Sequence, residues 1–286
     1  MITIRTYKSA DSLILAPHFN ALNPTEPVTS RQLDSRLSAW SLSWVICIED
    51  NPVGYTCVAP LPGLPGQYDL DVMIAQDWQR QRLGSQLIDF LKHELAESEV
   101  VSMSWGVTDS QHGLAEFLLH NGFDVDHKEQ ILARSNLDGL PLPPSRSLTI
   151  KTFSRRKAIH LFCRLYKESF IDHPWYQPYT PNEVAADIVS ARDILFLMDG
   201  QRQFGFVLLH IDENNEGKVE PIGIIPEEQR QGNGRFLFLT ALHQLKHRGA
   251  NRAIIGAWVT NTAAITLYQS LGFSHQQTIT YYAYQV

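Results

Sequence analysis

The chain has 286 residues, a length that suits two domains of about 140 residues each. Hydrophobic residues make up 44% of it and charged residues 19%, and no run approaches the roughly 20 apolar residues that span a bilayer. The net charge of -6 argues against nucleic-acid binding, and the first residues lack the pattern of a signal peptide. We therefore expect a cytoplasmic protein with a small-molecule or protein partner and no nucleic-acid or membrane role.

The first half opens with an alternating strand at Ile2–Tyr7. Its later part predicts a helix over 83–96, a strand over 100–107, a helix over 110–121 and a strand over 123–133.

The segment Leu140–Arg146 is rich in proline. Proline fixes φ and removes backbone donors, so this segment predicts an extended linker. The expected domains are residues 1–139 and 148–286, joined by the linker 140–147.

The second half carries strong periodic patterns. They predict, in order, helices near 155–170 and 181–191, strands at 194–198, 204–210 and 219–225, a helix that ends at Gly249, a strand at 254–259, a helix from Asn261 to Gly272 and a strand at 273–284. Strands that alternate with helices late in each half indicate an α/β (α+β) protein with a mixed sheet.

The two halves resemble each other. Gln79 corresponds to Gln229, and Gly122 to Gly272, at the same separation along the chain. Since a constant separation is hard to obtain by chance, we expect the halves to share one fold.

The most informative segment is 222–234, where a strand leads through a glycine-bearing turn into a helix. This geometry directs free backbone N–H groups and the positive helix end to one point, where a pyrophosphate would fit. Gly232 and Gly234 allow close backbone approach or a positive φ. The segment is not a Walker loop, because Lys-Ser/Thr is missing, and it is not a Rossmann fingerprint, because the glycine spacing differs.

The segment resembles motif A of the GNAT acetyltransferases, with Gln229, Gly232 and Gly234 in its defining positions, and Asn261 to Phe273 resembles motif B. The resemblance implies two tandem GNAT domains, each a mixed, mostly antiparallel sheet flanked by helices, with acetyl-CoA as co-substrate. It also implies a set of residues that bind this donor: Ile222, Ile224, Gln229, Arg230, Gln231, Gly232, Asn233, Gly234, Arg235 and Asn261.

The strand before the turn contains Pro221 and Gly223, which weaken regular pairing. We expect it to splay from its neighbour, so that the main chain of Ile222 and Ile224 binds the pantetheine arm, as the resemblance implies. An edge strand with a packing glycine is the alternative.

Asn261 and Tyr268 are about two helical turns apart and so share one face. By the resemblance, Asn261 would bind the pantetheine arm and Tyr268 would protonate the leaving thiolate. A phenol near pKa ~10 and a thiol near ~8.5 make that transfer uphill by about 2 kcal/mol. Asn261 as a mere helix cap and Tyr268 as a core residue remain alternatives.

An acceptor ammonium must lose a proton before its nitrogen can attack. Glu220 is the candidate general base, acting through water, and a solvated carboxylate is the alternative. The acceptor site in such folds is bordered by the loop 171–179, whose side chains suit a cationic or aromatic amine. Those side chains are Asp172, His173, Trp175, Tyr176 and Tyr179. An aromatic loop that only packs on the sheet is the other interpretation.

The first copy lacks the residues that the resemblance makes functional. Arg82 stands in place of Gly232, Gln111 of Asn261, Leu118 of Tyr268 and Leu70 of Glu220. We therefore expect the second copy to be active, a division shared with tandem members such as mycothiol synthase, whose substrate the resemblance does not reach.

The expected function is transfer of an acetyl group from acetyl-CoA to a primary amine of a small molecule or peptide by direct attack. The alternative is a non-catalytic acyl-CoA-binding or regulatory protein. No metal site is expected, because the cysteines lack metal-ligand spacing, and the oligomeric state stays open.

Overall fold

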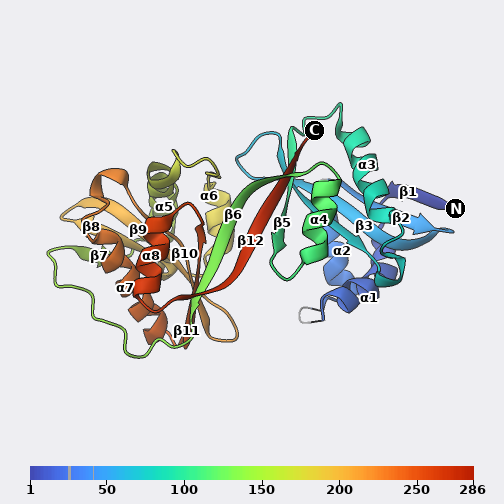
Figure 1. Cartoon of the computed structure of the whole chain (residues 1–286). Coiled ribbons are helices and arrows are strands. Elements are labelled where there is room, and N and C mark those ends of the chain that lie inside the picture. The colour runs from blue at the N-terminus through green and yellow to red at the C-terminus, as the bar shows by residue number, and fades with distance from the viewer. Residues whose placement is uncertain (25–26, 41) are drawn as a thin grey trace. The chain divides into compact units, whose positions relative to one another are not determined.

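The computed structural model describes residues 1–24, 27–40 and 42–286 (Figure 1). The chain forms two compact units, one of Met1–Asp126 with Tyr281–Val286 and one of His127–Thr280. Each unit consists of a sheet and flanking helices.

The first unit has the strand order β1-β2-β3-β4-β5-β12. Neighbours from β1 to β4 are antiparallel, and β4 and β5 are parallel. Its elements are β1 (Ile2–Thr6), η1 (Ser9–Asp11), α1 (Ser12–Leu22), α2 (Ser30–Ala39), β2 (Leu42–Ile48), β3 (Asn51–Pro60), β4 (Gln67–Ile74), η2 (Gln76–Trp78), α3 (Leu83–Leu95), β5 (Ser102–Thr108), α4 (His112–His120) and the end of β12 (Ser274–Gln285).

The second unit has the strand order β12-β6-β11-β10-β9-β8-β7. Strands β11 and β10 are parallel, and the other pairs from β6 to β7 are antiparallel. Its elements are β6 (Asp124–Arg134), β7 (Thr149–Lys151), α5 (Arg155–Phe170), α6 (Pro181–Asp187), η3 (Ala191–Asp193), β8 (Ile194–Asp199), β9 (Arg202–Ile211), β10 (Glu216–Ile224), η4 (Pro226–Glu228), α7 (Asn233–His247), β11 (Arg252–Trp258), α8 (Thr262–Ser270) and the beginning of β12.

The order of elements in the second half is the predicted one, and the expected α/β class with mixed, mostly antiparallel sheets is confirmed. One boundary differs, because α6 ends at Asp187 instead of near residue 191. Ile188 is already extended, and the Ser190 hydroxyl caps the separate turn η3 by accepting the backbone N–H of Arg192 at 3.2 Å.

The compact units do not follow the repeat along the chain, because each incorporates a strand from the other half. Residues 127–134 of β6 belong to the second unit, where Ala253↔Arg134 through Trp258↔Glu129 pair antiparallel with β11. Tyr281–Val286 belong to the first unit, where the backbone N–H of Val286 donates to Val101 O at 2.9 Å. The sheet of the second unit therefore contains side chains that precede the linker.

The core of the second unit lies between its sheet and helices. Helix α7 buries one apolar stripe, as the periodicity predicted, and this stripe consists of Leu237, Phe238, Ala241, Leu242 and Leu245. Both α5 and α7 pack on β9 and β10, the strands that lead to the turn at residues 225–232. Among the described residues, no helix is both long and apolar enough to cross a bilayer.

Candidate active site

Strands β10 and β11 separate partway along their length. Their parallel pairing runs only from Glu216↔Arg252 to Lys218↔Ile254, whereas β10 stays paired with β9 as far as Ile224. The register of β10 against β9 shifts between Val219 and Ile222, so a bulge in β10 turns this strand away from β11. The expected splayed strand is thus confirmed.

Hydrogen bonding to β9 indicates where the backbone groups at the end of β10 point. The N–H of Ile225 donates to Phe204 O on β9 at 3.0 Å. Since successive backbone groups of a strand point to opposite sides, the N–H groups of Ile222 and Ile224 face the side that β11 has left. The Gln229 side-chain amide donates a hydrogen bond to the Ile224 carbonyl oxygen at 2.9 Å. Two donors are thereby directed into the gap.

A cavity of about 120 Å³ lies at this divergence. Its walls come from β10, β11, α5, α8 and β6, all within the second unit. The lining residues that matter for chemistry are Glu129, Tyr166, Glu220, Ile222, Trp258, Asn261 and Tyr268. The structure therefore brings together three predicted functional side chains, Glu220, Asn261 and Tyr268, with one that the sequence interpretation missed, Glu129.

The turn after β10 combines left-handed residues with a helix start that has no side-chain cap. Gly232 precedes α7 in the left-handed region at φ 80°, and Arg230 is also left-handed at φ 59°. The Asn233 side chain braces the loop by donating to Glu228 O at 2.9 Å. No described side chain caps α7, so its first N–H groups remain available to a ligand.

Gly234 is not crowded by its neighbours. A Cβ added there would meet only Leu267 Cδ2, at 4.0 Å, which is ordinary contact. Packing within the protein therefore does not demand glycine at this position. The neighbouring Arg235 donates to Ser270 Oγ at 3.0 Å and so links α7 to α8.

Arg146, at the end of the linker, lies at the same turn. Its guanidinium donates to Asn233 Oδ1 at 2.9 Å and to Gln231 O at 2.8 Å. A Cβ on Gly232 would stand 2.5 Å from Arg146 Nη2. A cation thus reinforces the positive helix end. The sequence interpretation missed it, because the only signal was one arginine in a proline-rich segment.

Tyr268 is nearly buried on α8 and packs against Phe238 at a ring-centroid distance of 4.7 Å. Burial, and secondarily the charge of Glu220, raise the pKa of Tyr268 well above its ordinary value. The hydroxyl therefore keeps its proton and lines the cavity as a donor. Donation to a thiolate is then more uphill than from a free phenol, because each pKa unit adds about 1.4 kcal/mol.

Asn261 both caps a helix and lines the cavity. Its Oδ1 accepts the N–H of Ala264 at 3.2 Å at the start of α8. The two interpretations left open by the sequence are therefore compatible.

Glu220 sits at the bulge, half-buried, and its Oε2 forms an ion pair with Lys218 Nζ at 3.0 Å. Glu129 reaches the same place from β6, directly opposite Trp258 of β11. Burial and the charge of Glu220 raise the pKa of Glu129 to about 7. The sequence places Glu129 in the first repeat, so only the strand pairing reveals that it belongs to this cavity.

The predicted acceptor loop divides into two parts. His173 and Trp175 lie against Trp258, with ring centroids 5.0 and 6.1 Å away, and Trp175 also stacks on His127 at 5.1 Å. Trp258 lines the cavity, whereas His173 and Trp175 lie behind it and are not among the lining residues.

The other half of the loop packs on α5. Tyr176 and Tyr179 contact Tyr166, another cavity residue, at 5.7 and 4.8 Å between ring centroids. Burial, and next the charge of Glu220, raise the pKa of Tyr179 to about 12. Asp172 is exposed, and the structure assigns it no place in the cavity wall.

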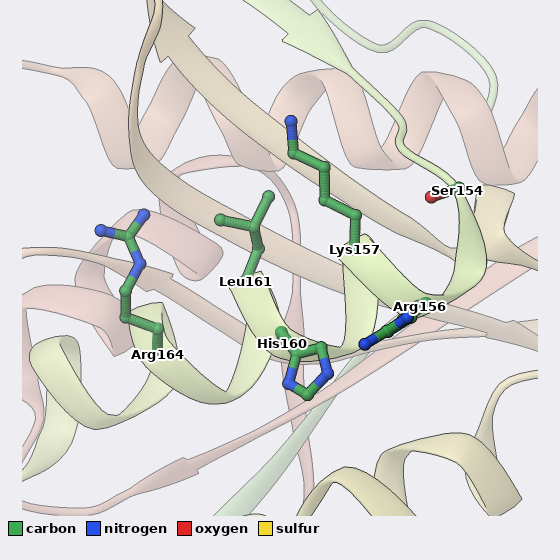
Figure 2. Close-up of a pocket in the computed structure, with 6 residues that line it drawn as sticks. All are labelled: Ser154, Arg156, Lys157, His160, Leu161 and Arg164. Carbon is green, nitrogen blue, oxygen red and sulfur yellow. The ribbon is translucent and has the colours of Figure 1, made fainter.

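A second hollow, of about 410 Å³, lies on α5 and is mostly basic. Figure 2 shows its side chains spread along the helix rather than converging on one point. Lys157 lies over the Phe153 ring at 4.3 Å, and Arg164 pairs with Glu168 at 3.8 Å. None of the predicted functional residues lines it.

The equivalent region of the first unit has the same backbone conformation at the turn but lacks the predicted functional side chains. Arg82 adopts the left-handed conformation of Gly232, with φ 63°. Leu118 and Leu70 are buried apolar residues, and Gln111 accepts the Thr108 N–H at 3.0 Å.

Both halves of the chain match the model of one protein family. The model of the acetyltransferase (GNAT) family matches residues 12–123 and 159–273. A mycothiol acetyltransferase of Kytococcus sedentarius is 30% identical over 146 residues, which cover 49% of each chain. The chain thus spans about half the length of such a relative.

Two further comparisons cover more of the chain. A mycothiol acetyltransferase of Actinosynnema mirum is 26% identical over 239 residues, covering 80% of this chain and 79% of that protein. The structure of a GCN5-related N-acetyltransferase from Sphaerobacter thermophilus matches with a TM-score of 0.72 and 15% identity, over 99% of this chain and 95% of that one. The structural similarity shows a common fold.

Proposed function

The chain belongs to the acetyltransferase (GNAT) family, and from this premise we propose that it transfers an acetyl group from acetyl-CoA to a primary amine of a small molecule or peptide. The observation that supports this most is the splay of β10 from β11, which leads from the loop at Gly232 to a cavity containing Tyr268. One ligand with a phosphate end and a reactive end would suit this path.

In this proposal the donor is bound mainly by backbone groups. The first N–H groups of α7 and the loop Gln229–Gly232 hold the pyrophosphate, and Arg146 adds a positive charge. The N–H groups of Ile222 and Ile224 bind the pantetheine arm, and Asn261 contributes from the start of α8. The phosphate end of the donor would thus lie at a helix start, where backbone N–H groups favour anions.

Catalysis would proceed by direct attack of the acceptor amine on the thioester. Glu220 removes a proton from the ammonium through water, and the Ile222 N–H polarises the carbonyl as it gains negative charge. Tyr268 then supplies a proton to sulfur when the C–S bond breaks. The Tyr268 hydroxyl lines the cavity and is protonated at neutral pH, although its raised pKa makes the transfer more uphill than from a free phenol.

A small-molecule amine is the proposed acceptor, as the names of the mycothiol acetyltransferases suggest. Trp258, with His173 and Trp175 against it, offers an aromatic wall beside the carboxylate of Glu220. Aromatic faces and a nearby negative charge both favour a cationic amine.

The experiment that tests this function measures thiol release from acetyl-CoA with a panel of primary amines, alongside calorimetric binding of CoA. Thiol release with at least one amine, lowered by Tyr268→Phe, supports the proposal. CoA binding without turnover on any amine would favour the non-catalytic acyl-CoA-binding protein, an alternative to which the degenerate first copy lends some support. Absence of CoA binding contradicts both.

A further inference from the structure

Two carboxylates converge beside Gly256 in the candidate active site. A Cβ added to Gly256 would stand 2.7 Å from Glu129 Oε1 and 3.3 Å from Glu220 Oε1. The two oxygens are therefore no farther apart than the sum of these distances, and both side chains line the cavity. Like charges at such a separation in a half-buried site resist simultaneous ionisation.

The two carboxylates have different surroundings. Lys218 forms an ion pair with Glu220 at 3.0 Å, which offsets the negative charge of that carboxylate. The pKa of Glu129 is raised mainly by burial and next by the charge of Glu220, and the charge of Lys218, the smallest of the three effects, lowers it. The other titratable side chains of the cavity are Tyr166 on α5 and Tyr268 on α8, and burial raises the pKa of both phenols, so both stay neutral.

We propose that Glu129, delivered to the second unit by β6 of the first repeat, is a catalytic residue that receives the acceptor's proton in partnership with Glu220. This inference rests on the proposed function, and it refines the role of Glu220. Glu220 keeps its ion pair with Lys218 and supplies the negative charge that attracts the ammonium, while Glu129 stores the proton.

The proton and electron balance is complete within this scheme. Ionised Glu129 takes one proton from the ammonium, and the freed nitrogen lone pair forms the C–N bond at the thioester carbonyl. When the C–S bond breaks, its electron pair stays on sulfur, and sulfur takes the Tyr268 proton. The nitrogen loses its second proton on becoming an amide, and this proton restores Tyr268. Glu129 then releases its proton to solvent.

The pKa of Glu129 fits this task. A base with a pKa of about 7 is ionised in half of the molecules at neutral pH and still accepts protons readily. The proposal also explains why Gly256 carries no side chain, since a Cβ there would displace the Glu129 carboxylate.

The test compares wild type, Glu129→Gln, Glu129→Asp and the control Glu213→Gln, whose exposed carboxylate lies in the turn before β10. Values of kcat/KM are measured from about pH 5.5 to 9 with the fastest alkylamine of the panel and with an aniline. The aniline is already neutral at pH 7 and needs no proton acceptor before attack. Thermal melting checks that each variant is folded.

We expect the wild type to gain kcat/KM for the alkylamine as pH rises through about 7. Glu129→Gln should lower that value at pH 7 by about 10²-fold and remove this limb of the profile, while its loss with the aniline stays below about 10-fold. Glu129→Asp should keep the limb and part of the rate. Glu213→Gln should match the wild type.

Equal losses with both amines, or an unchanged limb in Glu129→Gln, would overturn the role of Glu129 and leave the acetyltransferase function standing. Failure of the function itself gives a different result, namely no thiol release by the wild type. Carbon-13 NMR of labelled glutamate carboxyls provides a readout that needs no turnover. Glu129 should titrate near pH 7, and at lower pH in Glu220→Gln, whereas titration in the ordinary glutamate range contradicts the inference.

Discussion

Arg82 and Gly232 precede helices α3 and α7 with nearly the same left-handed backbone, at φ 63°, ψ 10° and φ 80°, ψ 5°. The fold therefore tolerates an arginine in this turn, at a cost of about 1 to 2 kcal/mol for the left-handed conformation. In the second copy an added Cβ at Gly232 would in addition stand 2.5 Å from Arg146 Nη2.

Gly232→Arg should weaken CoA binding by more than about 10-fold and lower the free energy of unfolding by about 1 to 2 kcal/mol. The side chain would enter the space of Arg146 Nη2 and of the expected pyrophosphate. Calorimetry and denaturant unfolding measure the two effects. Gly200→Arg is the matched control, because Gly200 is also left-handed, at φ 55°, with nothing within 4 Å of an added Cβ. It should lose stability alone, and an equal loss of affinity there contradicts the prediction.

Tyr268→Phe should lower kcat by about 10²-fold or more while the KM for acetyl-CoA changes little. Phenylalanine retains the packing on Phe238 and removes only the proton donor. Steady-state kinetics with the best amine of the panel decide this. Tyr284→Phe, which removes a hydroxyl from the first unit, is the control and should leave kcat unchanged. A Tyr268→Phe enzyme with wild-type kcat excludes this residue as the acid.

Arg146→Gln should raise the Kd for CoA by about 10-fold, as expected for the loss of a charge-assisted contact. The loss should be the same for 3′-dephospho-CoA, because the guanidinium lies at Gly232 and Gln231 in the turn. Arg156→Gln provides the control, since Arg156 lines the other hollow, on α5 (Figure 2). An unchanged Kd in Arg146→Gln would show that the helix start suffices.

The raised pKa of Glu129 also predicts a pH-dependent stability. The carboxyl binds its proton more tightly in the folded state, so this contribution is full below the ordinary value of 4.5 and is lost as pH rises to about 7. The wild type should therefore lose stability relative to Glu129→Gln between pH 5 and 8, by at most about 3 kcal/mol, and by less where water still reaches the group. Denaturant unfolding of both proteins at the two pH values provides the difference. A pH-independent difference contradicts the assignment.

Much of this protein was predictable from local patterns. The periodicity that predicted the helix ending at Gly249 corresponds to α7, and Pro221 with Gly223 predicted the splay of β10. The glycine pattern of residues 229–234 predicted the turn because backbone conformation depends on neighbouring residues. Helical spacing placed Asn261 and Tyr268 on one face, and both side chains line the cavity.

The sequence by itself thus determined the order of elements and the turn that opens α7, since each depends on residues close together in the chain. It also determined the repeat, since that follows from comparing the two halves of the sequence. Only the tertiary structure decided that β6 pairs with β11 and that Arg146 reaches Gly232. Strands β6 and β11 lie far apart in the chain, and no turn between them sets their pairing. For that reason Glu129 counts as a residue of the first half in the sequence and as a residue of the second unit in the fold.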